Sequence, residues 1–180
     1  GLYYMGKEKK FTPVRIIMPL LLVLLIFTNL GRTINKVNEH RDEFTHHLRG
    51  DDLYGLTPDW VNYIEMCRYA AEHVPDSITV ACRKPSIAFI KTKREFHGIY
   101  RINTKDPDEL LNNLKENNVK YVIMANLRKY PNRKTKYTIN TVKRYLYYIQ
   151  KEYPNVIRPV HQIGRDEKAY LFRINYDAKD

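Results

Sequence analysis

The side chains best suited to bind a partner are five basic residues within nine positions of the segment 126–137. They are interleaved with two tyrosines and are Arg128, Lys129, Arg133, Lys134 and Lys136. Clustered cations attract phospholipid headgroups, a lipid-linked phosphate or a nucleic acid. A solvated connector that binds nothing can have the same composition, and it stays open as the alternative. We expect these five residues to contact an anionic surface from an exposed, mobile loop.

The sequence holds no recognisable catalytic signature. Its seven glycines are too scattered for a phosphate-cradling or dinucleotide-binding turn. Ser77 and Ser86 lack the glycine-flanked elbow of a hydrolase nucleophile. The histidines of residues 40–47 have no metal-specific spacing, and turn chemistry explains the adjacent pair Asp51-Asp52. We therefore predict no catalytic, cofactor-binding or metal-binding residue and no cofactor.

Two cysteines, Cys67 and Cys82, fall on a predicted helix and a predicted buried strand. Buried free thiols are the commoner fate of such positions, although a disulfide could form outside the cytoplasm. The spacing of the two residues matches neither a CxxC motif nor a zinc-ligand pattern.

An uncharged apolar run over residues 16–30, IIMPLLLVLLIFTNL, determines the class of protein. A membrane-spanning helix needs roughly 17–25 mostly apolar residues, and the apolar-dominated segment extends over residues 11–34. A signal peptide is the second interpretation, but no small-x-small cleavage site follows the run. A buried core helix ranks third, because a helix that is apolar all round needs a large protein to cover it. We predict a transmembrane helix over residues 16–34.

The flanks of this run predict its orientation. Lys7, Lys9, Lys10 and Arg15 precede it, whereas only Arg32 and Lys36 lie within residues 31–40. Since lysine and arginine are retained on the cytoplasmic side, we expect a cytoplasmic loop over residues 1–15. A polar stalk over 35–56 and an extracytoplasmic domain over 57–180 then follow. In a bacterium this places the chain in the inner membrane with its domain in the periplasm.

From residue 57 onward, short apolar runs alternate with amphipathic segments. Thr57 and Asp106 are good helix N-caps, and further helices are expected over 85–90 and 141–153. The expected strands are residues 78–82, 99–102, 121–125, 156–163 and 169–174. Helical crossovers imply parallel strands. The fold class is therefore α/β, a single three-layer-like domain with a mostly parallel sheet and a C-terminal antiparallel hairpin, preceded by one transmembrane helix.

Three segments carry a resemblance that covers essentially the whole chain. They follow Thr57-Pro58-Asp59-Trp60 and are AAEHVPDSITVACRKPSIAFIKTKREFHGIYRI, DPDELLNNLKENNVKYVIMANL and HQIGRDEKAYLFRI. With the preceding helix and stalk, they resemble the C-terminal extracytoplasmic domain of bacterial multi-spanning glycosyltransferases of the dolichyl-phosphate-mannose–protein mannosyltransferase type. The resemblance implies a parent enzyme that takes a sugar from a polyprenyl-phosphate donor. It also implies catalytic acids in a first outside loop that this sequence does not contain, so Asp51-Asp52 does not inherit that role.

The composition agrees with a folded domain near an anionic partner. Hydrophobic residues make up 43% of the chain and the formal net charge is +11. We expect a non-catalytic C-terminal module of a membrane glycosyltransferase, which covers the active-site face or aids acceptor recognition. Its expected partners are the membrane and, through the parent enzyme, a lipid-linked sugar phosphate and an envelope acceptor, but no nucleic acid. A self-standing membrane-anchored envelope domain is the alternative.

Overall fold

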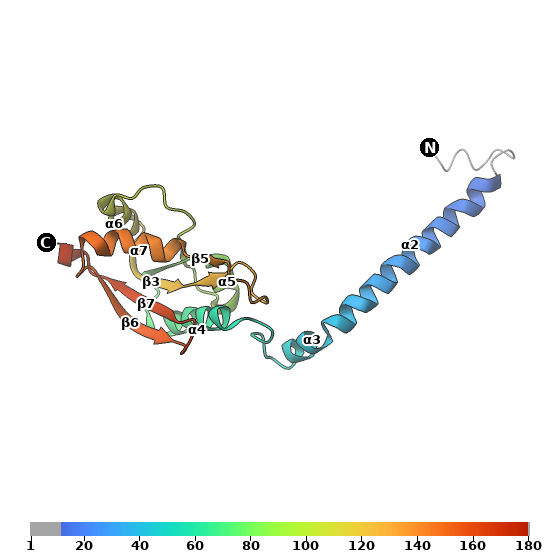
Figure 1. Ribbon diagram of the computed structural model, residues 1–180, viewed down its shortest axis with the longest axis horizontal. Coiled ribbons are helices and arrows are strands. Elements are labelled where there is room, and N and C mark those ends of the chain that lie inside the picture. The colour runs from blue at the N-terminus through green and yellow to red at the C-terminus, as the bar shows by residue number, and fades with distance from the viewer. Residues whose placement is uncertain (1–11, 180) are drawn as a thin grey trace. The chain divides into compact units, whose positions relative to one another are not determined.

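The computed structural model describes residues 12–179, which form two units (Figure 1). One unit extends to Tyr54 and consists of helices, and the other begins at Gly55 and is an α/β domain. The expected cytoplasmic loop, residues 1–15, lies outside the described residues except for residues 12–15, which begin the first helix.

Helix α2 (Thr12–Glu39) carries the apolar run, and its segment Ile16–Glu39 is long and apolar enough to cross a membrane. At about 1.5 Å per residue this segment spans about 36 Å, against a hydrocarbon core of about 30 Å. Two polar side chains inside the run bond to their own helix. Thr28 Oγ1 donates to the Leu24 carbonyl at 2.9 Å, and Asn29 Nδ2 donates to the Leu25 carbonyl at 2.8 Å. Such bonds lower the cost of a polar group in lipid.

Helix α3 (Arg41–Leu48) follows within the segment expected to be a polar stalk. It ends where Gly50 adopts a φ of +89°, a conformation that favours glycine. The amide of Gly50 then donates to the carbonyl of His47. The polar connector is therefore helical over much of its length.

The second unit is built on a five-stranded sheet in the order β2-β1-β3-β7-β6. Its strands are β1 (Thr79–Cys82), β2 (His97–Gly98), β3 (Val119–Ala125), β6 (Ile157–Ile163) and β7 (Ala169–Ile174). Strand β1 pairs in parallel with β2 and β3, whereas β7 runs antiparallel to both β3 and β6. The predicted fold class, with a parallel-dominated sheet and a closing hairpin, is confirmed.

Helices cover both faces of this sheet, as Figure 1 shows for α6 and α7 on one side and α4 on the other. The four helices are α4 (Pro58–His73), α5 (Pro85–Thr92), α6 (Pro107–Glu116) and α7 (Thr141–Glu152). The side chains of successive β3 residues point to opposite faces of the sheet. Val122 packs with the α6 and α7 side chains, and Ile123 is fully buried on the other side of the strand. The chain ends in a short 3-10 helix, η2 (Tyr176–Lys179).

Local sequence signals predicted the helices well, but they misplaced one strand and missed two others. Asp106 caps α6 by accepting from the amide of Asp108 at 2.9 Å. Thr57 is the N-cap of α4, but its hydroxyl donates to the Pro131 carbonyl instead of capping. The expected strand 99–102 is wrong, because β2 is only His97–Gly98. The segment expected to be a simple loop contains a small antiparallel pair, β4 (Leu127–Arg128) and β5 (Thr138–Ile139).

Cys67 of α4 and Cys82 of β1 are buried free thiols that both interact with the Tyr63 hydroxyl. Burial raises the pKa of Cys82 to about 11 and raises that of Cys67 well above its usual value. The Tyr63 hydroxyl accepts from the amide of Lys84 at 3.1 Å. The two cysteines therefore belong to the packing between α4 and the sheet, and their thiols stay protonated at neutral pH.

Arg94 closes the C-terminal end of α4. Its guanidinium donates to four carbonyls, those of Ala70, Val74, Pro75 and Ile78, and its side chain is 9% exposed. The last carbonyls of a helix have no partner within the helix and carry partial negative charge, so a cation here satisfies both needs. One side chain thus holds the end of α4 against the start of β1.

We predict that Arg94→Met lowers the free energy of unfolding by about 2–4 kcal/mol, because the partly buried carbonyls of Val74 and Ile78 lose the donor that Arg94 supplies. Chemical denaturation followed by the fluorescence of Trp60, the single tryptophan of the chain, measures this change. Arg101→Met is the matched control at an exposed position and should stay within about 0.5 kcal/mol of wild type. Equal effects of the two substitutions would contradict the capping role.

Candidate functional site

The basic segment predicted from the sequence lies between β4 and β5, and we call residues 129–137 the basic loop. Its root is closed by the Lys129 amide, which donates to the Tyr137 carbonyl at 3.1 Å. The four cationic side chains of the loop are exposed and are Lys129, Arg133, Lys134 and Lys136. Two of them lie over the ring of Tyr130, with Lys129 Nζ at 5.4 Å and Arg133 Cζ at 5.8 Å from its centroid. The loop therefore presents concentrated positive charge.

Arg128 is separate from these four residues. Its side chain is 16% exposed and donates to the carboxylates of Asp59 and Glu167, the latter through both terminal nitrogens. Its backbone amide also donates to Asp59 Oδ2 at 2.6 Å. This fifth residue of the predicted anionic contact is therefore engaged inside the domain, and we leave it out of the proposed contact surface.

Asp59, Arg128 and Glu167 form what we call the ion cluster. The Asp59 side chain is 1% exposed, and the Glu167 side chain is 31% exposed. The bonds to Arg128 lower the pKa of the Glu167 carboxyl, and the same bonds raise the pKa of the Arg128 guanidinium. Removing one charge of the cluster would leave its partner uncompensated, and the ion pair between Arg128 and Asp59 therefore fixes the root of the basic loop to the start of α4.

A small cavity of about 320 Å³ lies where β3 ends and α7 begins. It is lined by polar, cationic and aromatic side chains, namely Asn126, Thr138, Asn140, Lys143, Arg144 and Tyr147. In open α/β sheets ligands bind outside the carboxyl ends of the parallel strands. The basic loop and this cavity both follow the carboxyl end of β3, so cationic groups gather at the edge of the sheet where binding is expected.

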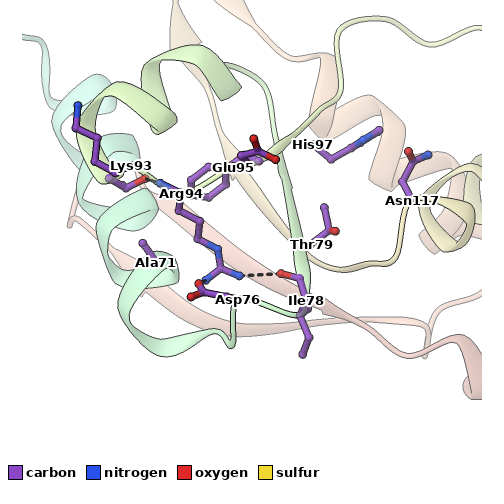
Figure 2. A pocket seen from close by; sticks show the side chains of 11 residues that line it. Ala71, Asp76, Ile78, Thr79, Lys93, Arg94, Glu95, His97 and Asn117 are labelled. Atoms are coloured by element: carbon purple, nitrogen blue, oxygen red, sulfur yellow. Dashed lines mark hydrogen bonds and ion pairs between the residues drawn. The ribbon is translucent and has the colours of Figure 1, made fainter.

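Another cavity, of about 680 Å³, lies at the opposite edge (Figure 2). Thr79 and His97, the first residues of β1 and β2, line it. Figure 2 shows the guanidinium of Arg94 turned toward Asp76 and the Ile78 carbonyl. Burial lowers the pKa of His97, so its imidazole is neutral at pH 7. Because Arg94 already donates to four backbone carbonyls at and beyond the end of α4, its guanidinium is not available to bind a ligand in this cavity.

The histidines take part in local contacts. His40 Nδ1 lies 3.1 Å from Glu43 Oε2, and the ring of His46 stacks on Tyr54 at 3.7 Å. His73 and His161 stack on Tyr69 at 4.0 and 3.7 Å. Within residues 12–179, no group of three or more histidine, cysteine or acidic side chains is arranged to hold a metal ion.

The ion cluster escaped the sequence analysis. Asp59 follows Pro58 at the start of α4, where an acidic residue is already explained by the helix dipole. Its partners lie 69 and 108 positions away along the chain. No local spacing connects residues so distant. The one available signal was that Asp59 directly precedes Trp60, where the apolar stripe of the predicted helix begins.

We predict that Arg128→Met destabilises the protein by about 3–5 kcal/mol, because the buried Asp59 carboxylate loses its counterion. Lys129→Met, at the next and exposed position, is the control and should change stability by less than about 0.5 kcal/mol. Denaturation followed by Trp60 fluorescence suits both variants, since the Trp60 indole donates to the Arg128 carbonyl at 3.0 Å. Similar stability of the two variants would argue against the cluster.

The ion cluster also predicts acid sensitivity. The pKa of Glu167 is lower in the folded than in the unfolded chain, so its stabilising contribution is complete above about pH 4.5 and is lost as the pH falls through the folded value. Stability should therefore decrease below about pH 4.5 by up to 1.4 kcal/mol per pH unit from this group. Glu167→Gln should show a shallower decrease in denaturation midpoints measured from pH 6 to 3. An identical slope would remove Glu167 as the cause.

Comparisons with known proteins leave the family open. No protein-family model matches the sequence, and no curated protein matches it. Among solved structures, the comparison finds a match to the C-terminal globular domain of an oligosaccharyltransferase from Archaeoglobus fulgidus. The TM-score is 0.40 and the identity 11%, and the match covers 67% of this chain and 99% of that one. A similarity at this level assigns no family.

Proposed function

We propose that this chain is a membrane-anchored, non-catalytic module of a membrane glycosyltransferase that uses a polyprenyl-phosphate sugar donor. In this proposal α2 spans the bilayer over about residues 16–34, residues 35–56 form a stalk, and residues 57–180 form an extracytoplasmic domain. The domain covers the active-site face of the enzyme or helps to recognise the acceptor. The four cations of the basic loop contact anionic headgroups or the phosphate of the lipid-linked sugar.

The observation that carries the anchor is the exposure of the apolar side chains of α2. From Ile16 to Phe27 the large apolar side chains are 48–68% exposed within their own unit, and none of the spanning window is buried. Soluble proteins rarely expose a contiguous apolar surface of this size, and a lipid environment would cover it. The glycosyltransferase assignment is supported by the sequence resemblance of residues 57–174 to the C-terminal domains of such enzymes.

The orientation in this proposal follows from the basic residues before the apolar run. Lys7, Lys9, Lys10 and Arg15 favour a cytoplasmic N-terminal side, which leaves the domain outside. The basic loop then meets the outer leaflet or a lipid-linked substrate that is used on that side.

One observation favours the alternative of a self-standing anchored binding domain. Residues 55–180 form a compact unit whose helices cover both faces of its sheet. Such a unit needs no other segment to complete its core, as expected of an independent domain. The alternative shares the anchor and differs in having no parent enzyme.

A deletion experiment separates the two. In the native organism, the codons for residues 57–180 are removed in frame, and sugar transfer from polyprenyl-phosphate donors is measured in isolated membranes. Under the proposal, transfer is lost and the complete gene restores it, whereas the purified 1–180 chain gives no product. An immunoblot against an upstream epitope controls for the amount of enzyme. Normal transfer after deletion would favour the self-standing domain, and turnover by the purified chain would overturn the non-catalytic role.

We predict that a reporter fused after Asp180 is active outside the cytoplasm. The expected result is activity of alkaline phosphatase, which needs an oxidising compartment, and no fluorescence of a reporter that matures only in the cytoplasm. Replacing Lys7, Lys9, Lys10 and Arg15 by glutamine should reduce the fraction of molecules that have the reporter outside the cytoplasm. The opposite reporter pattern in the unmodified chain would reverse the orientation and place the basic loop in the cytoplasm.

A further inference from the structure

Helix α5 leaves two large apolar side chains uncovered. Ala88 is 1% exposed and faces the interior, whereas Phe89 and Ile90 are 45% and 62% exposed. They border a shallow groove of about 530 Å³, which is lined by Pro85, Ser86, Phe89, Ile90, Glu95 and Phe96. The helix therefore packs by one narrow stripe and presents an apolar surface away from the domain.

Basic residues are frequent in the segment that carries this apolar surface. Residues 83–94 include five basic residues and no acidic one. Arg94 is committed to the carbonyls at the end of α4. Lys84 is the N-cap of α5 and Lys93 is its C-cap, so one lysine stands at each end of the apolar pair. Glu95 follows just beyond the second lysine.

Lys84 does not suit the helix start that it occupies, and Lys93, whose charge suits the dipole at the helix end, has a backbone conformation that is unusual for lysine. N-caps favour Ser, Thr, Asp or Asn, and a cation at this end opposes the helix dipole. Lys84 makes no side-chain capping bond, and the first turn of α5 has no acidic residue. Lys93 has a φ of +62°, a left-handed conformation that favours glycine. Neither the N-cap position of Lys84 nor the left-handed backbone of Lys93 stabilises α5 itself, which points to a role of these residues outside the helix.

We propose that α5 is a bilayer-contact helix. Phe89 and Ile90 enter the boundary between headgroups and acyl chains, and Lys84 and Lys93 bind the phosphates of anionic lipids. This inference rests on the proposed membrane anchor and adds to it a specific contact surface. An anionic bilayer fits both the apolar pair and the flanking charge.

The small area of the exposed apolar pair and the covalent link of the domain to α2 also favour a bilayer over a protein partner. A stable protein interface buries about 800 Å² on each side, far more than two exposed side chains provide. A tethered domain needs less, because its anchor already holds it near the lipid. Residues 40–54 separate the end of α2 from the domain, and eight of them form α3. Gly55 therefore stays within about 40 Å of the end of α2.

The test uses the full chain, reconstituted in phosphatidylcholine–phosphatidylglycerol vesicles that contain doxyl-labelled lipid. Ile90→Trp places a reporter on α5, and Val160→Trp is the matched control on β6, where the native valine is 48% exposed. Leu22→Trp reports on α2, and Tyr137→Trp reports on the basic loop. The native Trp60 is 2% exposed and gives the background. Circular dichroism confirms that each variant is folded.

The expected result for Ile90→Trp is loss of about half of the added tryptophan emission and a blue shift, with little quenching in Val160→Trp. Quenching at position 90 should weaken when Lys84→Gln and Lys93→Gln are added together, and also in vesicles of phosphatidylcholine alone.

Three outcomes would overturn the inference or its basis. An unquenched reporter at position 90 beside a quenched one at position 22 would overturn the α5 contact and leave the anchor intact, and it would point to a protein partner for this surface. An unquenched reporter at position 22 would overturn the anchor itself. Equal quenching at positions 90 and 160 would show no specific contact and would also overturn the inference.

Discussion

The ion cluster of Asp59, Arg128 and Glu167 is the interaction on which the arrangement of the domain depends. It joins the start of α4, strand β4 and the turn between β6 and β7, three places far apart in the sequence. Hydrogen bonds around it reinforce the same junction. The Thr57 amide donates to the Pro131 carbonyl at 2.7 Å, and Asn62 Nδ2 donates to the Glu167 carbonyl at 3.1 Å. Because Asp59 is buried, the cluster cannot be opened without leaving a charge unpaired in the interior.

Short-range signals predicted most of the fold. Thr57 and Asp106 mark helix starts, and Val142, Tyr145, Leu146 and Ile149 lie inward on α7 as their spacing predicts. Strands whose pairing partners lie far away in the sequence were harder to predict. Strand β2 is fixed by its neighbour β1 and not by an apolar run of its own, so its position was missed. The small sheet of β4 and β5 was hidden by basic and polar residues that have no strand pattern.

The candidate site shows the same division. Exposure of Lys129, Arg133, Lys134 and Lys136 follows from their charge, which resists burial. Arg128 is basic like its neighbours but is largely buried, because the carboxylates of Asp59 and Glu167 compensate its charge. Sequence composition cannot separate these cases. The exposed cations of the basic loop follow the carboxyl end of β3, and Lys84 follows that of β1, whereas Lys93 lines the cavity at the opposite edge of the sheet.

The position of β7 has a consequence for how this domain is made. The last strand of the chain lies inside the sheet, between β3 and β6, and it pairs with both (Figure 1). During synthesis the sheet thus stays divided between β3 and β6 until residues 169–174 have emerged, and Glu167, which precedes β7, reaches Arg128 equally late. Such long-range pairing makes folding slow compared with local helix formation. A chain truncated before Ala169 would therefore lack the centre of its sheet and not merely an edge strand.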